Sequence, residues 1–205
     1  MKNNTTAKLV RAAVIGALYV ALTAAVAPIA FGPVQFRVSE ALCSLILIFP
    51  EAAVGLTVGC FFSNLLFSTP IDVVLGTLAT LISAVAAAFV SGRISKPISR
   101  FLICSAFPVV ANGIIIPFTF LAATFSWKAY LLDVLSVSID EMLTVYILGG
   151  ALYFASLKAF KKYINNGEGK GSLKNAKNEN VAIESVAENI SEDGDISSDI
   201  SEDKE

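Results

Sequence analysis

Three long stretches without a charged residue constrain this chain more than any other feature of its sequence. Residues 12–36, 52–71 and 73–92 hold no Asp, Glu, Lys or Arg over 25, 20 and 20 positions. About 20 apolar residues in a helix cross the hydrocarbon core of a bilayer. The chain is therefore predicted to be an all-α, polytopic integral membrane protein rather than a soluble domain.

Three further apolar segments complete a prediction of six transmembrane helices. They are residues 38–49, 101–123 and 130–156. The first is too short to span a bilayer upright, so it is expected to be tilted, partly re-entrant or sheltered by its neighbours. Pro108 and Pro117 should bend the second, because each proline leaves a backbone carbonyl without its donor. Turns are expected at Pro50 and around residues 68–70.

The basic residues predict the orientation of the six helices. Six spans place three segments on the same side of the membrane: the N-terminus, the loop after residue 92 and the C-terminal end. These segments together hold nine Lys and Arg, whereas the other side holds only Arg37 and Lys128. Cytoplasmic loops carry the excess of basic residues. We therefore expect a multi-pass protein of the cell membrane with both termini in the cytoplasm.

Charge also divides the chain into regions. Residues 1–163 carry eleven basic and six acidic residues, a net charge of +5. Residues 164–205 carry four basic and eleven acidic residues, a net charge of −7. The second region is rich in Asn, Ser, Glu and Asp and cannot bury enough apolar surface to fold. The predicted organisation is a cytoplasmic N-terminus at 1–8, a six-helix transmembrane domain at 9–163 and a disordered acidic cytoplasmic tail at 164–205. A short partner-binding helix in the tail is the alternative.

The chain contains no histidine, which removes Ser-His-Asp and Cys-His catalysis and the His-containing zinc sites. Cys43, Cys60 and Cys104 each lie in an apolar run and are expected to be buried, reduced thiols. No catalytic residue, metal site, cofactor or nucleic-acid partner is expected, and the chain is not predicted to be an enzyme. An aspartyl hydrolase using Asp133 and Asp140 fails because two helical turns separate the acids by about 10 Å.

Polar residues predict where a ligand binds. They form three stripes at helical spacing, namely Arg37, Glu40 and Ser44; Asp72, Gly76, Thr80 and Ser83; and Asp133, Ser136, Asp140 and Thr144. Charged residues within a membrane normally face a bundle interior or a wet cavity. We therefore predict an outward-facing polar pocket whose excess of carboxylates favours a cationic or donor-rich ligand.

Several of these residues have structural interpretations as well. Arg37 and Glu40 could pair with each other, and Asn112 could satisfy a carbonyl freed by a proline. Trp127 could be an ordinary interfacial aromatic residue. The adjacent acids Asp140 and Glu141 are the hardest to explain without a ligand.

Small residues recur at intervals of four, at Ala13, Ala17 and Ala21 and again at Gly55 and Gly59. This spacing lets helices approach closely. Considered alone, the pattern favours packing within the bundle.

Residues 32–42, Gly-Pro-Val-Gln-Phe-Arg-Val-Ser-Glu-Ala-Leu, resemble the signature of the QueT family, and residues 49–51 and 64–76 fit it too. That family comprises the queuosine-precursor S-components of energy-coupling factor (ECF) transporters. The resemblance covers about residues 8–162. It implies a subunit that captures a 7-deazaguanine, such as queuine or its aminomethyl precursor, at the outer face. A transmembrane coupling protein and two cytoplasmic ATPases would drive uptake, since this chain has no ATP-binding loop.

The resemblance also implies residue roles. Glu141 or Asp140 would bind the guanine edge, Asn112 or Asn64 the carbonyl, and Asp72 or Glu40 an aminomethyl cation, while Trp127 or Phe36 would stack on the ring. Ala13, Ala17 and Ala21 would contact the coupling protein. The candidate ligand-binding residues are Glu141, Asp140, Asn112, Asp72, Asn64, Glu40, Arg37, Gln35 and Trp127. An S-component for another heterocyclic nutrient and a standalone membrane scaffold or channel subunit remain alternatives.

Overall fold

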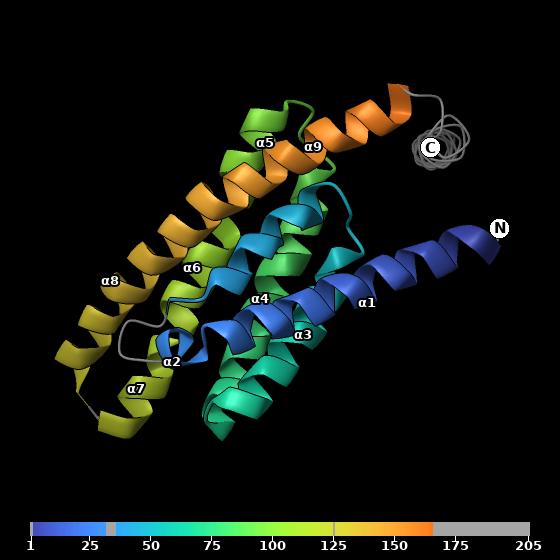
Figure 1. Cartoon of the computed structure of the whole chain (residues 1–205). Helices are drawn as coiled ribbons and strands as arrows, with labels where there is room; N and C mark the ends of the chain where they lie inside the picture. The colour runs from blue at the N-terminus through green and yellow to red at the C-terminus, as the bar shows by residue number, and fades with distance from the viewer. Residues whose placement is uncertain (1, 32–35, 125, 166–205) are drawn as a thin grey trace, which may run out of the picture. The chain divides into compact units, whose positions relative to one another are not determined.

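The computed structural model describes residues 2–31, 36–124 and 126–165, and every element within these ranges is a helix (Figure 1). The elements are α1 (Lys2–Ala25), α2 (Ala27–Ala30), η1 (Val38–Leu47), α3 (Ala52–Phe67), α4 (Pro70–Ser91), α5 (Pro97–Cys104), α6 (Ala106–Ile115), α7 (Pro117–Thr124), α8 (Trp127–Leu143), η2 (Thr144–Gly149) and α9 (Gly150–Asn165). The all-α prediction is confirmed. The chain divides into two units, residues 1–157 and 158–205, and the description below concerns the first. The predicted tail beyond residue 165 lies outside the described residues.

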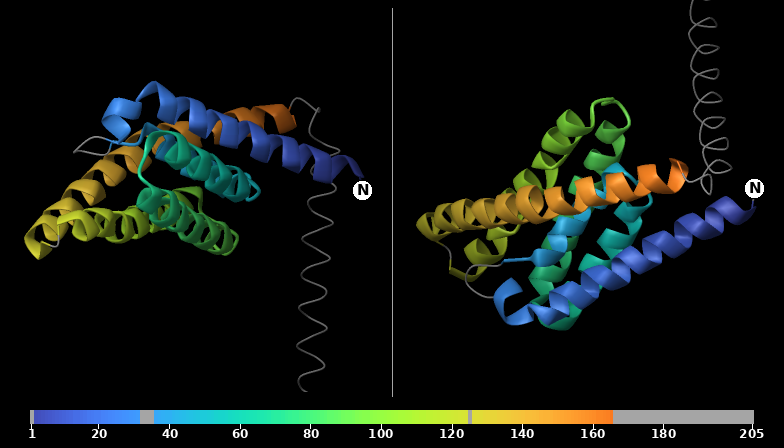
Figure 2. Two further views of the ribbon diagram at one scale, coloured as in Figure 1. Left: turned by 90° about the horizontal axis from the view of Figure 1, so that it is seen from below. Right: turned by 45° about the horizontal axis from the view of Figure 1, so that its top comes forward.

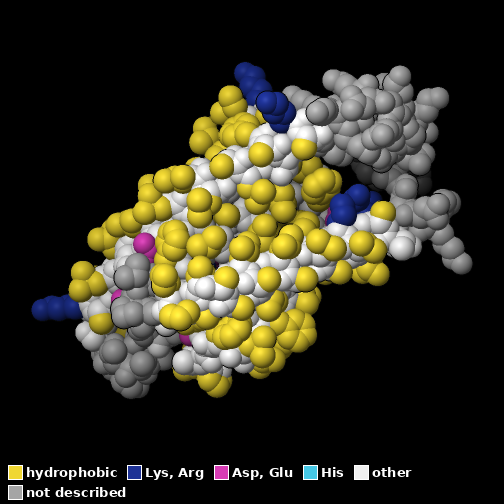
Figure 3. All heavy atoms as spheres, viewed as in Figure 1, with side chains coloured by type: hydrophobic (Ala, Val, Ile, Leu, Met, Phe, Trp, Pro, Cys, Tyr) yellow, Lys and Arg dark blue, Asp and Glu magenta, His cyan; other side chains and the backbone are white. Residues whose placement is uncertain are grey.

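The surface of the bundle suits contact with lipid. Among the described residues, three helical stretches are long and apolar enough to cross a membrane: Thr5–Ala25, Pro70–Ser91 and Pro97–Thr119. Large hydrophobic side chains stay exposed along the helices, and hydrophobic side chains are spread over the whole length of the bundle in Figure 3. A soluble monomer rarely exposes apolar patches of this extent. η1 and α3 are apolar but shorter than a full span.

The short segment predicted at 38–49 is η1, and it is sheltered by its neighbours. η1 packs against α1, α3, α4, α5 and η2, and it lies in the middle of the bundle in the views of Figures 1 and 2. It is a 3-10 helix of ten residues, eight of them buried. A 3-10 helix rises about 2.0 Å per residue against 1.5 Å in an α-helix, so the same residues reach further across the bundle. Runs of this length are uncommon.

Glycines bring α1 and α3 into close contact. A Cβ atom on Gly55 would lie 2.1 Å from the carbonyl oxygen of Ala12, and one on Gly59 would lie 2.7 Å from that of Gly16. The two backbones therefore meet only because these positions have no side chain. The prediction that Gly55 and Gly59 mediate helix packing is confirmed.

Prolines and polar turns divide the other helices where the sequence predicts. The segment around 101–123 is broken into α5, α6 and α7, with interruptions at Ser105 and Ile116 near Pro108 and Pro117. The turn predicted at 68–70 separates α3 from α4, and α4 starts with Pro70 at its first position. The Thr69 hydroxyl accepts a hydrogen bond from the Asp72 amide over 3.4 Å, which caps this helix.

The last predicted helix begins at Trp127 and is continuous through α8, η2 and α9. η2 is a π-helical segment of six residues that begins three positions after Glu141. It packs against η1, and a Cβ on Gly149 would lie 3.2 Å from the carbonyl oxygen of Ala41. π-Helical turns interrupt α-helices mostly at functional sites. Gly149 thus lets the irregular turn approach η1 closely.

Candidate functional site

Six of the predicted ligand-binding residues are buried inside the bundle, and we call them the polar cluster. They are Arg37, Glu40, Asn64, Asp72, Asn112 and Glu141, with exposed fractions of 0–6%. They come from η1 or its N-terminal flank, α3, α4, α6 and α8. Groups of this kind are costly to bury unless hydrogen bonds or a ligand compensate them. Their partners therefore show which of them are available to a ligand.

Both carboxylate oxygens of Glu40 accept a hydrogen bond within the protein. Its Oε1 accepts from the Tyr19 hydroxyl of α1, and its Oε2 accepts from the Cys43 thiol over 3.1 Å. Beside it, the Thr23 hydroxyl of α1 donates to Ser39 Oγ over 2.8 Å. These contacts favour a role for Glu40 in anchoring η1 to α1, rather than the contact with an aminomethyl cation that the resemblance implies.

Arg37 lies at the start of η1, and its guanidinium has no close carboxylate partner. The ion pair found among the described residues joins Arg11 to Glu51, with Nη2 and Oε1 2.6 Å apart. The suggested ion pair between Arg37 and Glu40 therefore does not form. Arg37 still interacts electrostatically with Glu40 and Asp72 at longer range. Its Cζ lies 5.1 Å from the centre of the Phe31 ring, a cation–π contact. Its Nε and Nη2 atoms are buried and have no hydrogen-bond partner within the described residues.

Asn64 and Asp72 connect α3 to the start of α4. The Asn64 amide donates to the Asp72 carbonyl oxygen over 3.2 Å and to Cys60 Sγ over 3.3 Å. Asp72 Oδ2 accepts from the hydroxyls of Ser68 and Thr69, whereas its Oδ1 is buried without a partner in the described part of the chain. Asp72 therefore binds the two hydroxyls that precede α4 with one oxygen, whereas its other oxygen has no partner in the described chain.

Gly76 marks the place where Asn64 and Arg37 meet α4. A Cβ there would lie 2.7 Å from Asn64 Nδ2 and 3.5 Å from Arg37 Nη1. The stripe of Asp72, Gly76, Thr80 and Ser83 is buried along α4, as is the stripe of Arg37, Glu40 and Ser44. The prediction that these two stripes face the bundle interior is confirmed.

Asn112 and Glu141 form a pair across α6 and α8. Asn112 Nδ2 donates to Glu141 Oε1 over 2.9 Å, and both side chains are buried. Gly113 permits this approach, since a Cβ at that position would lie 2.2 Å from Ser138 Oγ of α8. Asn112 Oδ1 is left without a hydrogen-bond partner among the described residues. Glu141 also interacts electrostatically with Arg37 and Glu40, so the pair belongs to the same cluster.

The remaining predicted residues lie elsewhere. Asp140 is half-buried, whereas its neighbour Glu141 points into the bundle, because adjacent residues on a helix point about 100° apart. The Oδ2 atom of Asp140 is nevertheless buried and has no partner in the described chain. Asp133 and Ser136 of the third stripe are also half-buried. Trp127 is 66% exposed and packs edge-on against Tyr130, as an interfacial aromatic residue would. Gln35 lies outside the described residues.

Sequence reasoning missed Tyr19 and Thr23, the residues that fasten α1 to η1. Both are 1% exposed. Their spacing of four in an otherwise apolar helix was the available signal, since it places two hydroxyls on one face. The three cysteines are buried and free, as predicted.

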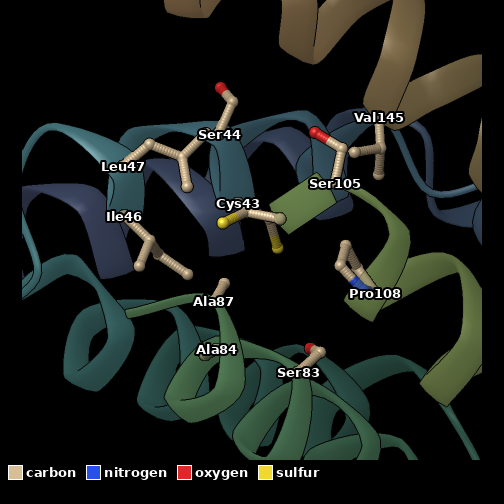
Figure 4. Close-up of a pocket in the computed structure, with 11 residues that line it drawn as sticks. Cys43, Ser44, Ile46, Leu47, Ser83, Ala84, Ala87, Ser105, Pro108 and Val145 are labelled. Atoms are coloured by element: carbon tan, nitrogen blue, oxygen red, sulfur yellow. The ribbon is translucent and has the colours of Figure 1, made fainter. Parts of the chain in front are cut away.

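A small cavity lies in the core of the bundle, and the residues that line it are not those of the polar cluster (Figure 4). Its volume is about 10 Å³, room for roughly one water molecule. It is lined by residues of η1, α4, α5, α6 and η2 and by Ser105 between α5 and α6; Ser44 and Ser83 are also among the lining residues. A cavity of this size does not hold a heterocyclic ligand.

The alanines of α1 lie on its outer face. Ala13, Ala17 and Ala21 are exposed, whereas Ala12 and Gly16 make the contact with α3. Ala13 and Ala17 line an apolar groove of about 370 Å³ between α1 and α3, together with Val54 and Val58. The alanine stripe is therefore an accessible surface, and the interpretation that it packs within the bundle is wrong.

These features define an all-helical membrane protein with a buried cluster of charged and amide side chains, several of whose polar atoms have no partner in the described chain. The model of the QueT transporter family matches residues 9–158. The chain belongs to this family, and its predicted location in a membrane is confirmed.

A curated relative agrees with this assignment. The chain is 40% identical over 84 residues to the queuosine precursor transporter QueT of Lactococcus lactis subsp. cremoris (strain MG1363). The aligned part is 40% of this chain and 50% of the relative, so the match spans about half the length of that protein. No solved structure matches the chain.

Proposed function

We propose that this chain is the substrate-binding S-component of an ECF transporter and captures a queuosine precursor at the outer face of the cell membrane. The proposed ligand is a 7-deazaguanine such as queuine or its aminomethyl precursor. The observation that carries the proposal is the buried Asn112–Glu141 pair, in a chain similar to a queuosine precursor transporter.

The chemistry of the pair suits a guanine-like edge. Such an edge presents adjacent N–H donors, which a carboxylate accepts through two oxygens. Asn112 holds Glu141 Oε1 from the opposite helix, and a held acceptor loses less conformational freedom when a ligand binds. Asn112 Oδ1 offers a further acceptor. Asp72 Oδ1, also without a partner in the described chain, is the proposed acceptor for an aminomethyl cation.

We propose that uptake is driven by partner proteins that dock on α1. Ala13, Ala17 and Ala21 are exposed on this helix, and the groove beside two of them has an almost wholly apolar lining. Small side chains let a second helix approach closely. The proposed partners are a transmembrane coupling protein and two cytoplasmic ATPases.

The proposed topology has six membrane crossings, with both termini in the cytoplasm. α1, η1, α3 and α4 supply four of the crossings. α5–α7 and the continuous α8–η2–α9 supply the other two. The Arg11–Glu51 ion pair would lie at the cytoplasmic side, where it ties α1 to the start of α3 away from the polar cluster.

Mass spectrometry of small molecules that copurify with the full chain from its host tests the substrate. A 7-deazaguanine released on denaturation, and absent from a Glu141→Gln preparation, is the expected result. Glu51→Gln is the matched control, since it neutralises a carboxylate outside the polar cluster. Another nutrient released from the wild type would instead assign the chain a different substrate.

A further inference from the structure

The Arg37 guanidinium is the least satisfied group of the polar cluster. It is 4% exposed, yet Nε and Nη2 have no hydrogen-bond partner within the described residues. A buried cation with unused donors is unfavourable, and an acceptor supplied by a ligand would relieve that cost. Arg37 therefore marks a second recognition point, on η1, distinct from the Asn112–Glu141 pair of α6 and α8.

Aromatic packing holds the guanidinium and leaves its N–H edge available. Phe31 lies against Arg37 in the cation–π contact, and the Phe31 and Phe67 rings stack at 6.3 Å with an interplanar angle of 30°. An aromatic ring packs against the flat face of a guanidinium, whereas hydrogen-bond acceptors approach in the plane of the guanidinium, where its N–H groups point. The adjacent Nε and Nη2 groups then point two donors toward one acceptor region.

The charges around Arg37 determine what kind of acceptor fits. Glu40 and Asp72 interact with it electrostatically, and Glu141 does so as well. Two carboxylates, those of Glu40 and Asp72, beside one cation already leave the surroundings negative, so a carboxylate or phosphate on the ligand would be repelled. An uncharged oxygen acceptor meets no such repulsion and can still take two hydrogen bonds through its two lone pairs.

We infer that Arg37 binds a carbonyl oxygen of the transported heterocycle and selects ligands that carry an oxo group at that position over those that carry an amino group. The inference rests on the proposed function and adds to it a specificity-determining residue. An amino group would place N–H donors against N–H donors, and this mismatch is a strong basis for rejection.

Calorimetric titration of the purified full chain with two ligands tests this role. One is 7-aminomethyl-7-deazaguanine, and the other is its 2,6-diamino analogue, in which an amino group replaces the carbonyl oxygen and N1 carries no proton; the Arg37 variant isolates the part of the preference that comes from the oxo group. Wild-type protein should prefer the oxo ligand by at least about 10-fold, the scale of a charge-assisted hydrogen bond. Arg37→Met should reduce this preference by about 10-fold or more. Arg11→Met, which removes an arginine outside the cluster, should leave it unchanged.

The outcomes separate this inference from the proposed function. If the wild type binds neither ligand, the proposed substrate fails and the role of Arg37 fails with it. If the wild type binds the oxo ligand but accepts the diamino analogue equally, the role of Arg37 is overturned, and so is the contact of Glu141 with the N1–H of the guanine edge, because N1 of the diamino ring carries no proton. Retention of the full preference in Arg37→Met overturns the role of Arg37 alone. If Arg37→Met does not fold, Arg37→Lys replaces it, because lysine keeps the charge but lacks the paired N–H donors. An undiminished preference of Arg37→Lys for the oxo ligand would overturn the role of Arg37 as well.

Discussion

The Tyr19 hydroxyl donates a hydrogen bond to the Glu40 carboxylate, and the two side chains are 1% and 0% exposed. This contact joins α1 to η1 in the interior of the bundle. The opposite face of α1 carries the exposed alanines, and η1 begins beside Arg37. α1 thus carries the proposed docking surface for the coupling protein on one face and contacts η1, next to the proposed ligand site, with the other.

Replacing Tyr19 by Phe should destabilise the protein. The change removes the donor to Glu40 Oε1 and leaves a buried carboxylate oxygen unsatisfied, at a cost of about 1–3 kcal/mol. A lower thermal unfolding midpoint in detergent is expected. Tyr130→Phe is the matched control, because its hydroxyl makes an exposed hydrogen bond of 3.3 Å to the Ile114 carbonyl. Equal midpoints for the two variants would contradict an anchoring role for Tyr19.

Replacing Gly55 by Ala should separate α1 from α3. The added Cβ would lie 2.1 Å from the Ala12 carbonyl oxygen, and backbone atoms cannot rotate away as a side chain can. Overpacking of this kind costs about 1–3 kcal/mol or more. Gly92→Ala is the control, since a Cβ there meets nothing within 4 Å. A Gly55→Ala protein as thermostable as Gly92→Ala would contradict the close α1–α3 packing.

Replacing Ala17 by Trp should abolish uptake while leaving ligand binding intact. The bulky side chain would fill the groove between α1 and α3 on the outer face of α1, away from the polar cluster. Uptake by cells and affinity of the purified protein are measured on the same variant. Val14→Trp is the matched control, because Val14 is 53% exposed on the same helix but does not line the groove. Unimpaired uptake in Ala17→Trp would argue against docking at this surface.

Removing residues 166–205 should leave ligand affinity unchanged. Every residue of the polar cluster lies within residues 1–157, and the removed segment is the acidic, polar part of the chain. Titration of the truncated protein with the ligand found for the full chain gives the comparison. A change in affinity of more than about 10-fold, equivalent to 1.4 kcal/mol, would show that the acidic segment takes part in binding.

Much of the fold follows from local sequence signals. Uncharged runs predict the apolar helices, and Pro108 and Pro117 predict the interruptions between α5, α6 and α7. The burial of Asp72 and Thr80 follows from helical spacing, because polar residues three or four apart share a face and avoid lipid together.

Other features depend on contacts between distant segments and could not be predicted in this way. The 3-10 geometry of η1 and the π-helical geometry of η2 arise where these two elements pack against each other. Nothing local indicates that Tyr19 occupies an oxygen of Glu40, since 21 positions separate them.

Titration of the purified protein with 7-aminomethyl-7-deazaguanine tests the central claim most directly. The wild type should bind it, and Glu141→Gln should weaken binding by about 10-fold or more, the scale of a charge-assisted hydrogen bond. Glu51→Gln should bind as the wild type does. Absence of wild-type binding, or equal binding by Glu141→Gln and Glu51→Gln, would contradict the proposal that the polar cluster captures a queuosine precursor.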